Sequence, residues 1–547
     1  MSAPERLRIA GGTIHDPANG VDGEIRDLYI EDGRLVGSLP DGAPVIDARG
    51  MIVMPGGVDI HSHFASSSCN HARRLSPEEH AADPVAPPPL IDGDWTPRSG
   101  TGGTVPSNFT TGYRYAGLGY TTCFDAAVAP VMARHSHAEL DDTPCVDGGI
   151  FALLGNDEYL LRLIQAGQRD RARDYVAWML GATGAYAVKV VNPGGVEAWK
   201  AGSRNVGGLD EHIGDRPVTP RAILETLADA ATALGLPHPI HIHCNNLGIP
   251  GNVATTLATM EALAGRRAHF THIQFHAYGE GGGWKSGASR LIEYVNAHPE
   301  ASADVGQVMF GPAMTITADG PVEYLLYKST GRRWVNIDIE LETGCGIVPL
   351  AYKDSAAVSA LQWAVGLELF LLSSDPWRVV LSTDHPNGGS FLAYPQLIQL
   401  LMDRGARDEQ LKRVNPKLLA GSALADGLAR EYTLNEIAII TRAGPARLLG
   451  LRQKGHLGTG ADADVTVYAR ESDLARMFAT PRYVIKGGVL VVEEGQLRRA
   501  PGGGRHHVRP GYDDALLPDL KRYFEEHSSV AFANYPVRNL PGTPART

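Results

Sequence analysis

Two histidines two positions apart, His61 and His63 in the string PGGVDIHSHF, have the spacing of a metal-binding pair. Alternate side chains of a β-strand lie on the same face, so both imidazoles can reach one ion. The apolar run MIVMPGGVDI predicts a strand that ends at these residues. Asp59 precedes the pair and is a candidate partner that would orient one imidazole. The alternative is that both histidines are structural or exposed.

A lysine, Lys189, lies in the middle of the β-branched string AYAVKVVNPGG, which predicts a buried strand. Burial of a charged ammonium group is costly unless the group is paired or loses its proton. A neutral lysine amine can add CO₂ to form a carbamate, whose two oxygen atoms can bridge two metal ions. The alternative is a lysine that forms a salt bridge across the interior.

Three further strings place possible ligands at the ends of apolar runs. The strings and their residues are HPIHIHCNNLG with His241 and His243, HFTHIQFHAYGEGGG with His269, His272 and His276, and VVLSTDHPNGG with Asp384 and His385. Any one of these histidines could have a purely structural role. Along the chain, however, the order is HxH, Lys, His, His, Asp, each at the end of a separate run. Imidazole and carboxylate ligands suit zinc and similar divalent ions, so the series predicts a metal centre.

The elements that must position these residues are strands that alternate with helices. From about residue 56 to 450, short β-branched runs alternate with helical stretches such as RAILETLADAATALG. This pattern predicts an α/β fold, a (β/α)₈ barrel of the TIM type, with its active site at the C-terminal ends of the strands. Residues 1–55 and 451–547 contain short strands divided by Gly, Asp and Pro. They predict one small composite β-sandwich domain built from both ends, followed by a tail.

Composition and charge exclude several classes of function. The chain of 547 residues has a formal net charge of −11, which argues against a nucleic-acid partner. No apolar run approaches the ~20 residues of a membrane helix, and the N-terminal string MSAPERLRIAGG lacks the apolar stretch of a secretory signal. The five cysteines form no CxxC pair, so we expect a cytoplasmic protein without a disulfide framework.

The series of strand-end residues resembles the amidohydrolase superfamily, in the branch with a carboxylated lysine that includes dihydroorotases and hydantoinases. The strings EIAIITRAGPARLLGL and GHLGTGADADVTVY also resemble the C-terminal junction of that superfamily. The resemblance implies two divalent metal ions, zinc before iron, manganese or cobalt, and N6-carboxylysine at Lys189. The implied ligands are His61, His63, Lys189, His243, His272 and Asp384. His243 is preferred to His241 because relatives have a short polar segment after the ligand, and His272 is preferred because it ends the apolar part of its strand.

A closer resemblance covers almost the whole chain. It is to the family that contains the A component of formylmethanofuran dehydrogenase and the hydrolase component of bacterial formyltransferase/hydrolase complexes. The strings that carry it include TGYRYAGLGYTTCFDAAVAP, DVGQVMFGPAMTITADGP, CGIVPLAYKDSAAVSALQWAVGLEL and STDHPNGGSFLAYP. The resemblance implies hydrolysis of formylmethanofuran to formate and methanofuran in one-carbon metabolism, with Asp384 as the acid–base residue and a formyltransferase among the partner subunits. Asn192, Asn246 and Asn387 follow ligand strands, where they could bind substrate or only shape turns.

Three other functions are weighed against this one. The chain could run the condensation direction as the A component of a formylmethanofuran dehydrogenase, it could be a cyclic amidase of the hydantoinase or dihydroorotase kind, or it could be an assembly protein without catalysis. Residues 64–112 hold a long polar insertion, either a lid or partner-docking loop or a solvated surface loop. Arg73, Arg74 and Arg114 lie in or beside it and could attract an acidic carrier tail or serve as exposed charges.

Overall fold

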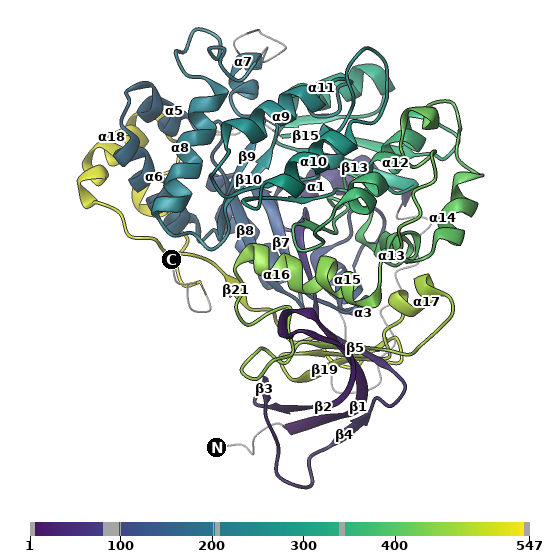
Figure 1. The fold of residues 1–547 in the computed structure, drawn as a ribbon. Coiled ribbons are helices and arrows are strands. Elements are labelled where there is room, and N and C mark those ends of the chain that lie inside the picture. The colour runs from purple at the N-terminus through teal and green to yellow at the C-terminus, as the bar shows by residue number, and fades with distance from the viewer. Residues whose placement is uncertain are drawn as a thin grey trace.

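The computed structural model describes residues 6–79, 98, 100–200, 202, 208–337 and 345–540. Within these residues the chain forms a large barrel with a smaller β-domain below it (Figure 1). A third, three-stranded sheet lies between two barrel strands in the sequence.

Eight parallel strands of the described chain form the barrel, and their order around it follows the sequence. They are β6 (Gly57–Ser62), β7 (Tyr120–Val128), β8 (Asp147–Leu153), β9 (Ala187–Val191), β10 (Ile240–His243), β11 (Ala268–Phe270), β12 (Ala301–Asp304) and β16 (Val379–Val380). The ring closes where Ser62 pairs with His385 in a parallel bridge, and the backbone N–H of His63 donates to the His385 carbonyl oxygen at 2.7 Å. The predicted α/β fold with a TIM-like barrel is therefore confirmed.

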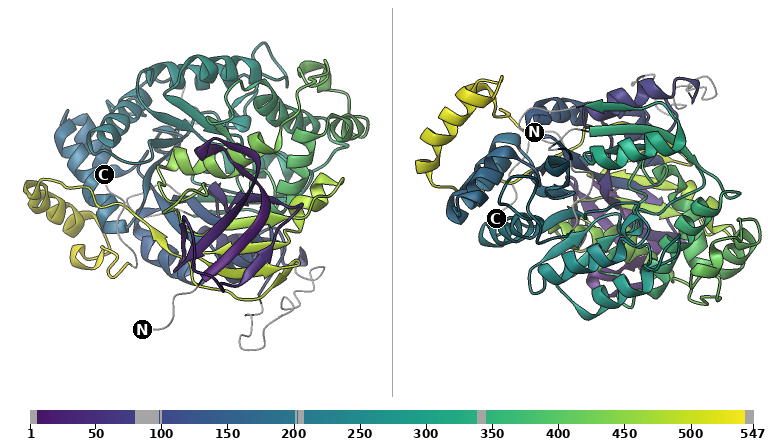
Figure 2. Two further views of the ribbon diagram at one scale, coloured as in Figure 1. Left: turned by 60° about the horizontal axis from the view of Figure 1, so that its bottom comes forward. Right: turned by 90° about the horizontal axis from the view of Figure 1, so that it is seen from above.

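Helices cover the outside of the barrel (Figures 1 and 2). In α8 (Pro220–Ala233), the Thr219 side chain caps the helix by accepting a hydrogen bond from the Ala222 N–H at 3.2 Å, and Pro220 occupies the first turn. Ile223 and Leu227 are buried at helical spacing, which fixes the face turned to the strands. Others of the outer layer are α4 (Ala133–Asp141), α6 (Arg169–Thr183), α9 (Val253–Ala262), α10 (Ala288–Ala297), α12 (Ala357–Leu372) and α13 (Tyr394–Met402).

The smaller domain combines strands from both ends of the chain. Its strands are β1 (Arg6–Asp16), β2 (Val21–Glu31), β3 (Arg34–Val36), β4 (Val45–Asp47), β5 (Ile52–Pro55), β17 (Val465–Tyr468), β18 (Tyr483–Lys486), β19 (Val489–Glu493) and β20 (Gln496–Leu497). The two sets join where β5 pairs antiparallel with β17, and Figure 2 shows the N-terminal and C-terminal strands side by side. The domain boundaries near residues 55 and 450 stay a proposal.

The smaller domain contacts the beginnings of barrel strands, at the end opposite to the expected active site. The Thr466 hydroxyl donates to the Gly119 carbonyl oxygen just before β7. Nearby, the buried ammonium of Lys454 forms ion pairs with Asp464 and with Asp147 at the start of β8. Because the buried charges are paired across the junction, this contact is suited to a structural role.

The three-stranded sheet, called the inserted sheet below, consists of β13 (Gly311–Thr317), β15 (Cys345–Tyr352) and β14 (Val335–Ile337), with α11 (Gly320–Thr330) beside it. It packs against α1 (Ser68–Leu75), through a cluster that includes Cys69, Ala72, Ile316 and Ile347. The sequence predicts a polar loop at residues 64–112, but α1 lies within this segment. The reason is that Cys69 and Ala72 are one helical turn apart and share a buried face. Residues 80–97 and 99 of the insertion lie outside the described residues.

The C-terminal tail packs on the barrel of the same chain. In it, β21 (Arg505–His506) pairs in parallel with β8. In α18 (Leu517–His527), the Phe524 ring lies edge-on to Trp178 of α6, with the ring centroids 5.6 Å apart.

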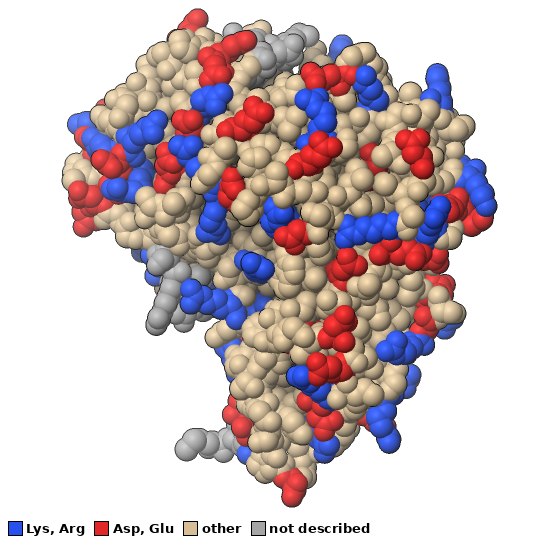
Figure 3. Space-filling view, in the orientation of Figure 1, with Lys and Arg blue, Asp and Glu red and all other residues tan. Residues whose placement is uncertain are grey.

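The described helices include none that is both long enough and apolar enough to cross a membrane. On the face seen in Figure 3, acidic and basic side chains are interspersed over both domains. A mixed surface of this kind produces no strong field of one sign on that face.

Candidate metal centre

His61, His63 and Asp384 form what we call the first ligand group. His61 Nε2 and His63 Nε2 lie 3.0 and 3.1 Å from Asp384 Oδ1, and the two nitrogen atoms are 3.3 Å apart. All three side chains are buried. They meet because His61 and His63 lie at the C-terminal end of β6, and Asp384 follows β16, its neighbour where the barrel closes. The convergence of three ligand atoms suits one divalent cation.

His243, His272 and His276 form the second ligand group, with ligand atoms within 4.8 Å of one another. His243 ends β10, His272 follows β11, and His276 ends the short helix η3 (Ile273–His276). Among the described residues, His272 Nδ1 and both ring nitrogens of His276 have no hydrogen-bond partner. Buried polar atoms without partners call for an explanation, and a bound cation supplies one. The structure thus brings together the two predicted ligands His243 and His272. It also places His276, which the sequence analysis did not prefer as a ligand, beside them.

Lys189 lies in the middle of β9 and is 1% exposed. Its Nζ has no hydrogen-bond partner among the described residues, and its side chain lines the same cavity as His63, His243, His272 and Asp384. Burial lowers the pKa of the amine to about 7, although the charges of Asp384 and Asp304 act in the opposite direction. A large fraction of the amine is therefore neutral near pH 7, which is the form that can become a carbamate.

Three buried aspartates that the sequence does not single out hold the histidines in place. Asp319 lies 3.1 Å from His243 Nε2. Asp304 Oδ1 accepts the backbone N–H of His272 at 2.9 Å. Asp125 Oδ2 accepts three consecutive backbone N–H groups, those of residues 64–66, and its Oδ1 lies 3.8 Å from His63 Nδ1. Asp125 lies in β7 and Asp304 ends β12, so a carboxylate late in an apolar strand is the signal that could have indicated them.

The electrostatics of the first ligand group favour a cation. Burial lowers the pKa of His63, but the neighbouring carboxylates of Asp125 and Asp384 outweigh burial and raise it to about 9. Burial raises the pKa of Asp384, but the neighbouring rings of His272 and His61 outweigh burial and hold it well below its usual range. Asp384 is therefore ionised at neutral pH, and a metal ion could replace the proton that His63 attracts.

The remaining predicted residues lie around the two groups. Asn387 Nδ2 donates to Asp384 Oδ1 at 2.9 Å. Asn192 Nδ2 donates to Asp319 Oδ1 at 2.9 Å, and the half-buried Asn246 donates to Thr255 Oγ1 at 3.1 Å. Asp59 accepts the backbone N–H of His61 at 3.1 Å, and its other oxygen accepts the hydroxyl groups of Tyr115 and Tyr394.

Four residues in and around the two ligand groups have a strained backbone conformation. His272, Asp384, Asn192 and Asn246 have φ angles of 35°, 51°, 41° and 62°, a left-handed conformation that costs free energy for residues other than glycine. The two asparagines tolerate this conformation best, which agrees with the turn-forming role weighed for them. For His272 and Asp384, this conformation directs each side chain toward the other ligands of its own group.

A cavity of about 510 Å³ leads from the ligands to the surface, between the loop after β10 and the inserted sheet with α11. Its walls are mostly apolar and aromatic, and include Phe275, Trp284, Leu326 and Tyr352. The described lining does not contain Arg73, Arg74 or Arg114. Arg73 instead donates to the Pro106 carbonyl oxygen and to Asn108. The cavity therefore suits an apolar or aromatic group next to the ligands.

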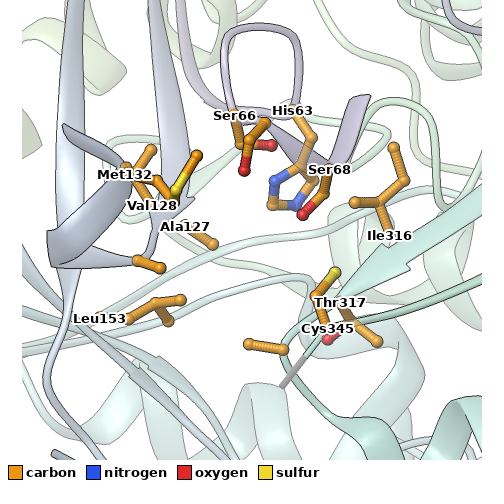
Figure 4. Close-up of a pocket in the computed structure, with 13 residues that line it drawn as sticks. His63, Ser66, Ser68, Ala127, Val128, Met132, Leu153, Ile316, Thr317 and Cys345 are labelled. Carbon is orange, nitrogen blue, oxygen red and sulfur yellow. The ribbon is translucent and has the colours of Figure 1, made fainter. Parts of the chain in front are cut away.

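A second, much smaller cavity of about 20 Å³ lies against His63, as Figure 4 shows. It is also lined by Ser66, Ser68, Thr317 and Cys345. This volume is enough for about one water molecule. His63 therefore lines both the large cavity and this small one.

Comparisons with known proteins match this chain over most of its length. The sequence pattern of the Amidohydrolase family matches residues 44–492. The chain is 43% identical to the protein FwdA of Methanocaldococcus jannaschii, over 97% of this chain and 96% of that protein. It is 42% identical to the A component of the formyltransferase/hydrolase complex Fhc of Methylorubrum extorquens, over 90% of this chain and 89% of that protein. The crystal structure of the Methylorubrum extorquens FhcABCD complex with methylofuran contains a chain with a TM-score of 0.92 and 38% identity, covering 99% of this chain and 100% of that chain.

Proposed function

We propose that this chain, which belongs to the amidohydrolase family, hydrolyses the N-formyl group of a formylmethanofuran-type carrier to formate and the free amine. The observation that carries the proposal is the pair of ligand groups that line one cavity with Lys189. Support for the substrate class comes from the relatives, because the Fhc relative belongs to a formyltransferase/hydrolase complex and the FhcABCD structure contains methylofuran.

Two divalent metal ions, zinc as the first choice, fit the side chains that are present. The first ligand group would hold one ion, and His243 and His272 would hold the other, with a carboxylated Lys189 shared between them. The unpartnered Lys189 Nζ and His272 Nδ1 support this assignment, as does the mixture of imidazole and carboxylate ligands. When bound, such ions supply the Lewis acidity that activates water and polarises a formyl oxygen.

The residues of the chain perform the proton transfers and hold the reacting groups. Asp384 would accept a proton from the attacking water and deliver it to the leaving amine nitrogen, as a general base and then a general acid. Asn387 donates to Asp384 Oδ1, which favours the ionised carboxylate and fixes its orientation. The apolar walls of the cavity would hold an apolar or aromatic part of the carrier and exclude water from it.

Replacing Asn387 by alanine tests the role assigned to it. A hydrogen bond to a charged group contributes about 1.5–3 kcal/mol, so we expect kcat to fall about tenfold or more. Loss of this donor also raises the pKa of Asp384, so the acidic limb of the pH–rate profile should move to higher pH. Because the pKa of Asp384 is well below its usual range, kcat is measured from below pH 4 up to pH 8, with the metal content determined at each pH. Since the Asn387 side chain also accepts the Ile316 N–H at 2.6 Å, an unshifted profile with a lower kcat would indicate a structural role only.

We also propose that the chain works beside partner subunits that include a formyltransferase, as the name of the Fhc relative suggests. The alternative of a formylmethanofuran dehydrogenase component that condenses formate with the amine has less support, because the relative with a solved structure belongs to a formyltransferase/hydrolase complex. A cyclic amidase of the hydantoinase or dihydroorotase kind would share the ligand set and differ in the pocket.

The experiment that tests the function uses the full-length chain, purified with the subunits it is co-expressed with. Metal content per chain is measured together with turnover of formylmethanofuran, hydantoin and dihydrouracil. We expect about two metal ions per chain and formate release from the formyl carrier alone. Turnover of a cyclic amide without formate release would favour the cyclic amidase, and metal-free, inactive protein would contradict the proposal.

A further inference from the structure

Three imidazoles form a continuous hydrogen-bonded row beneath the first ligand group. His61 Nδ1 lies 2.9 Å from His241 Nε2, and His241 Nδ1 lies 3.0 Å from His238 Nε2. His238 Nδ1 lies 2.8 Å from the Leu448 carbonyl oxygen. All three rings are fully buried, so bulk water does not compete for these contacts.

The carbonyl at the far end determines which nitrogen atom of each ring carries the proton. A carbonyl oxygen can only accept, so His238 must donate from Nδ1, and the Nε2 atom of this neutral ring is left as an acceptor. His241 must then donate from Nδ1 to His238, and its own Nε2 is an acceptor. By the same step, His61 donates from Nδ1 to His241. The lone pair of His61 Nε2 is therefore free, and this atom lies 3.0 Å from Asp384 Oδ1 in the first ligand group.

The other neighbours of His61 Nδ1 agree with this direction. Asp304 Oδ2 lies 3.5 Å away and can only accept, and the Thr271 hydroxyl is also in contact and can accept. Asp304 Oδ2 lies 3.1 Å from His269 Nε2, so His269 can donate to it. An imidazole binds a metal ion through an unprotonated nitrogen, and the hydrogen bond of the other nitrogen fixes which one that is.

We propose that His241 and His238 are positioning residues, which hold His61 in the tautomer that presents Nε2 to the first metal site. The inference rests on the metal site of the proposed function. It explains why the motif HPIHIH contains more histidines than the second ligand group uses: His243 faces that group, whereas His241, two residues earlier, belongs to the row.

The test compares His241→Gln with His241→Leu in the full-length chain. A glutamine amide can accept from His61 with its oxygen and donate to His238 with its nitrogen, whereas leucine fills similar space and does neither. Removing such an outer partner of a metal ligand lowers metal affinity about 10- to 100-fold. We expect that loss in His241→Leu and recovery to within a few-fold of wild type in His241→Gln. Zinc affinity is measured by competition with a chelator, on protein whose thermal unfolding without metal is recorded.

His137→Leu is the matched control, because His137 is also buried and also contacts a backbone carbonyl oxygen, that of Thr183, without belonging to the row. We expect it to leave zinc affinity unchanged. If His241→Leu does not fold, His238→Leu and His238→Gln make the same comparison one ring further away. Equal zinc affinity of the Leu and Gln variants would overturn the inference. So would a third zinc ion per chain that is lost in His241→Gln, since His61, His241 and Asp304 would then be ligands.

The zinc readout separates this inference from the proposed function. If the wild-type chain binds two ions but releases no formate, the proposed reaction fails and the Leu and Gln comparison still decides the role of the row. If formate is released and the two variants bind zinc alike, the role proposed for the three-histidine row is contradicted and the proposed reaction is supported.

Discussion

Asp384→Asn is expected to lower kcat for formate release by about 10²- to 10⁴-fold, the range that general acid–base catalysis contributes. Asp384 is the carboxylate that contacts both His61 and His63, and its pKa is held well below the usual range because the effect of the neighbouring imidazole rings outweighs burial. It is therefore ionised and can accept a proton at neutral pH. An asparagine amide keeps an oxygen atom for a metal ion but cannot take the proton. The measurement is kcat with metal content determined on the same samples.

Asp157→Asn provides the control for loss of a buried carboxylate elsewhere. Asp157 is 3% exposed, caps α5 (Glu158–Gln165) by accepting the Leu160 N–H, and accepts the Tyr175 hydroxyl. The asparagine oxygen can accept the Leu160 N–H, and its NH₂ group can donate to the Tyr175 oxygen in place of the second bond, so kcat and metal content should stay close to wild type. If Asp384→Asn kept its metal and lost less than about tenfold in kcat, the acid–base role would have to be assigned to another residue.

The barrel and the gathering of its strand-end residues could be predicted from the sequence because both depend on local patterns. His61 and His63 lie on one face of a strand, and Lys189 interrupts an apolar run, so each stands out within about ten residues. A barrel then brings together the C-terminal ends of strands that are far apart in the chain. The comparisons confirm the family resemblance and leave the individual ligands as proposals.

The supporting residues could not be predicted in the same way, because their roles depend on contacts between distant parts of the chain. Asp319 reaches His243 from beside the inserted sheet, and His238 contacts Leu448, which is 210 residues away. A single Asp or His in a loop has no pattern that distinguishes these roles. The helix α1 is hard to predict for a related reason: its polar residues dominate the sequence, and its buried face forms only against the inserted sheet.

Lys189→Ala is expected to reduce formate release to background and to lower the metal content of the purified chain. If a carbamate on Lys189 is shared by two ions, alanine removes ligand atoms from both at once. Lys189→Arg keeps a long basic side chain, but its guanidinium stays protonated and cannot add CO₂. We therefore expect the arginine variant to fail as the alanine variant does. Full metal content and activity in either variant would rule out the carbamate.

The pH dependence of CO₂ uptake isolates the carbamate from a simple loss of packing at Lys189. Only the neutral amine adds CO₂, and burial, opposed in part by Asp384, lowers the pKa of Lys189 from 10.5 to about 7. Above this pKa the neutral form dominates, and below it the ammonium does. With the dissolved CO₂ concentration held fixed, CO₂ uptake by metal-free protein, followed with labelled CO₂ and with zinc added to trap the carbamate, should therefore be about tenfold slower at pH 6 than at pH 8, with a plateau above about pH 8. An unperturbed lysine would instead give a rate that rises about a hundredfold over this interval and continues to rise, because the neutral fraction grows tenfold per pH unit until the pKa is reached. A plateau thus ties the lowered pKa of the buried amine to assembly of the metal site.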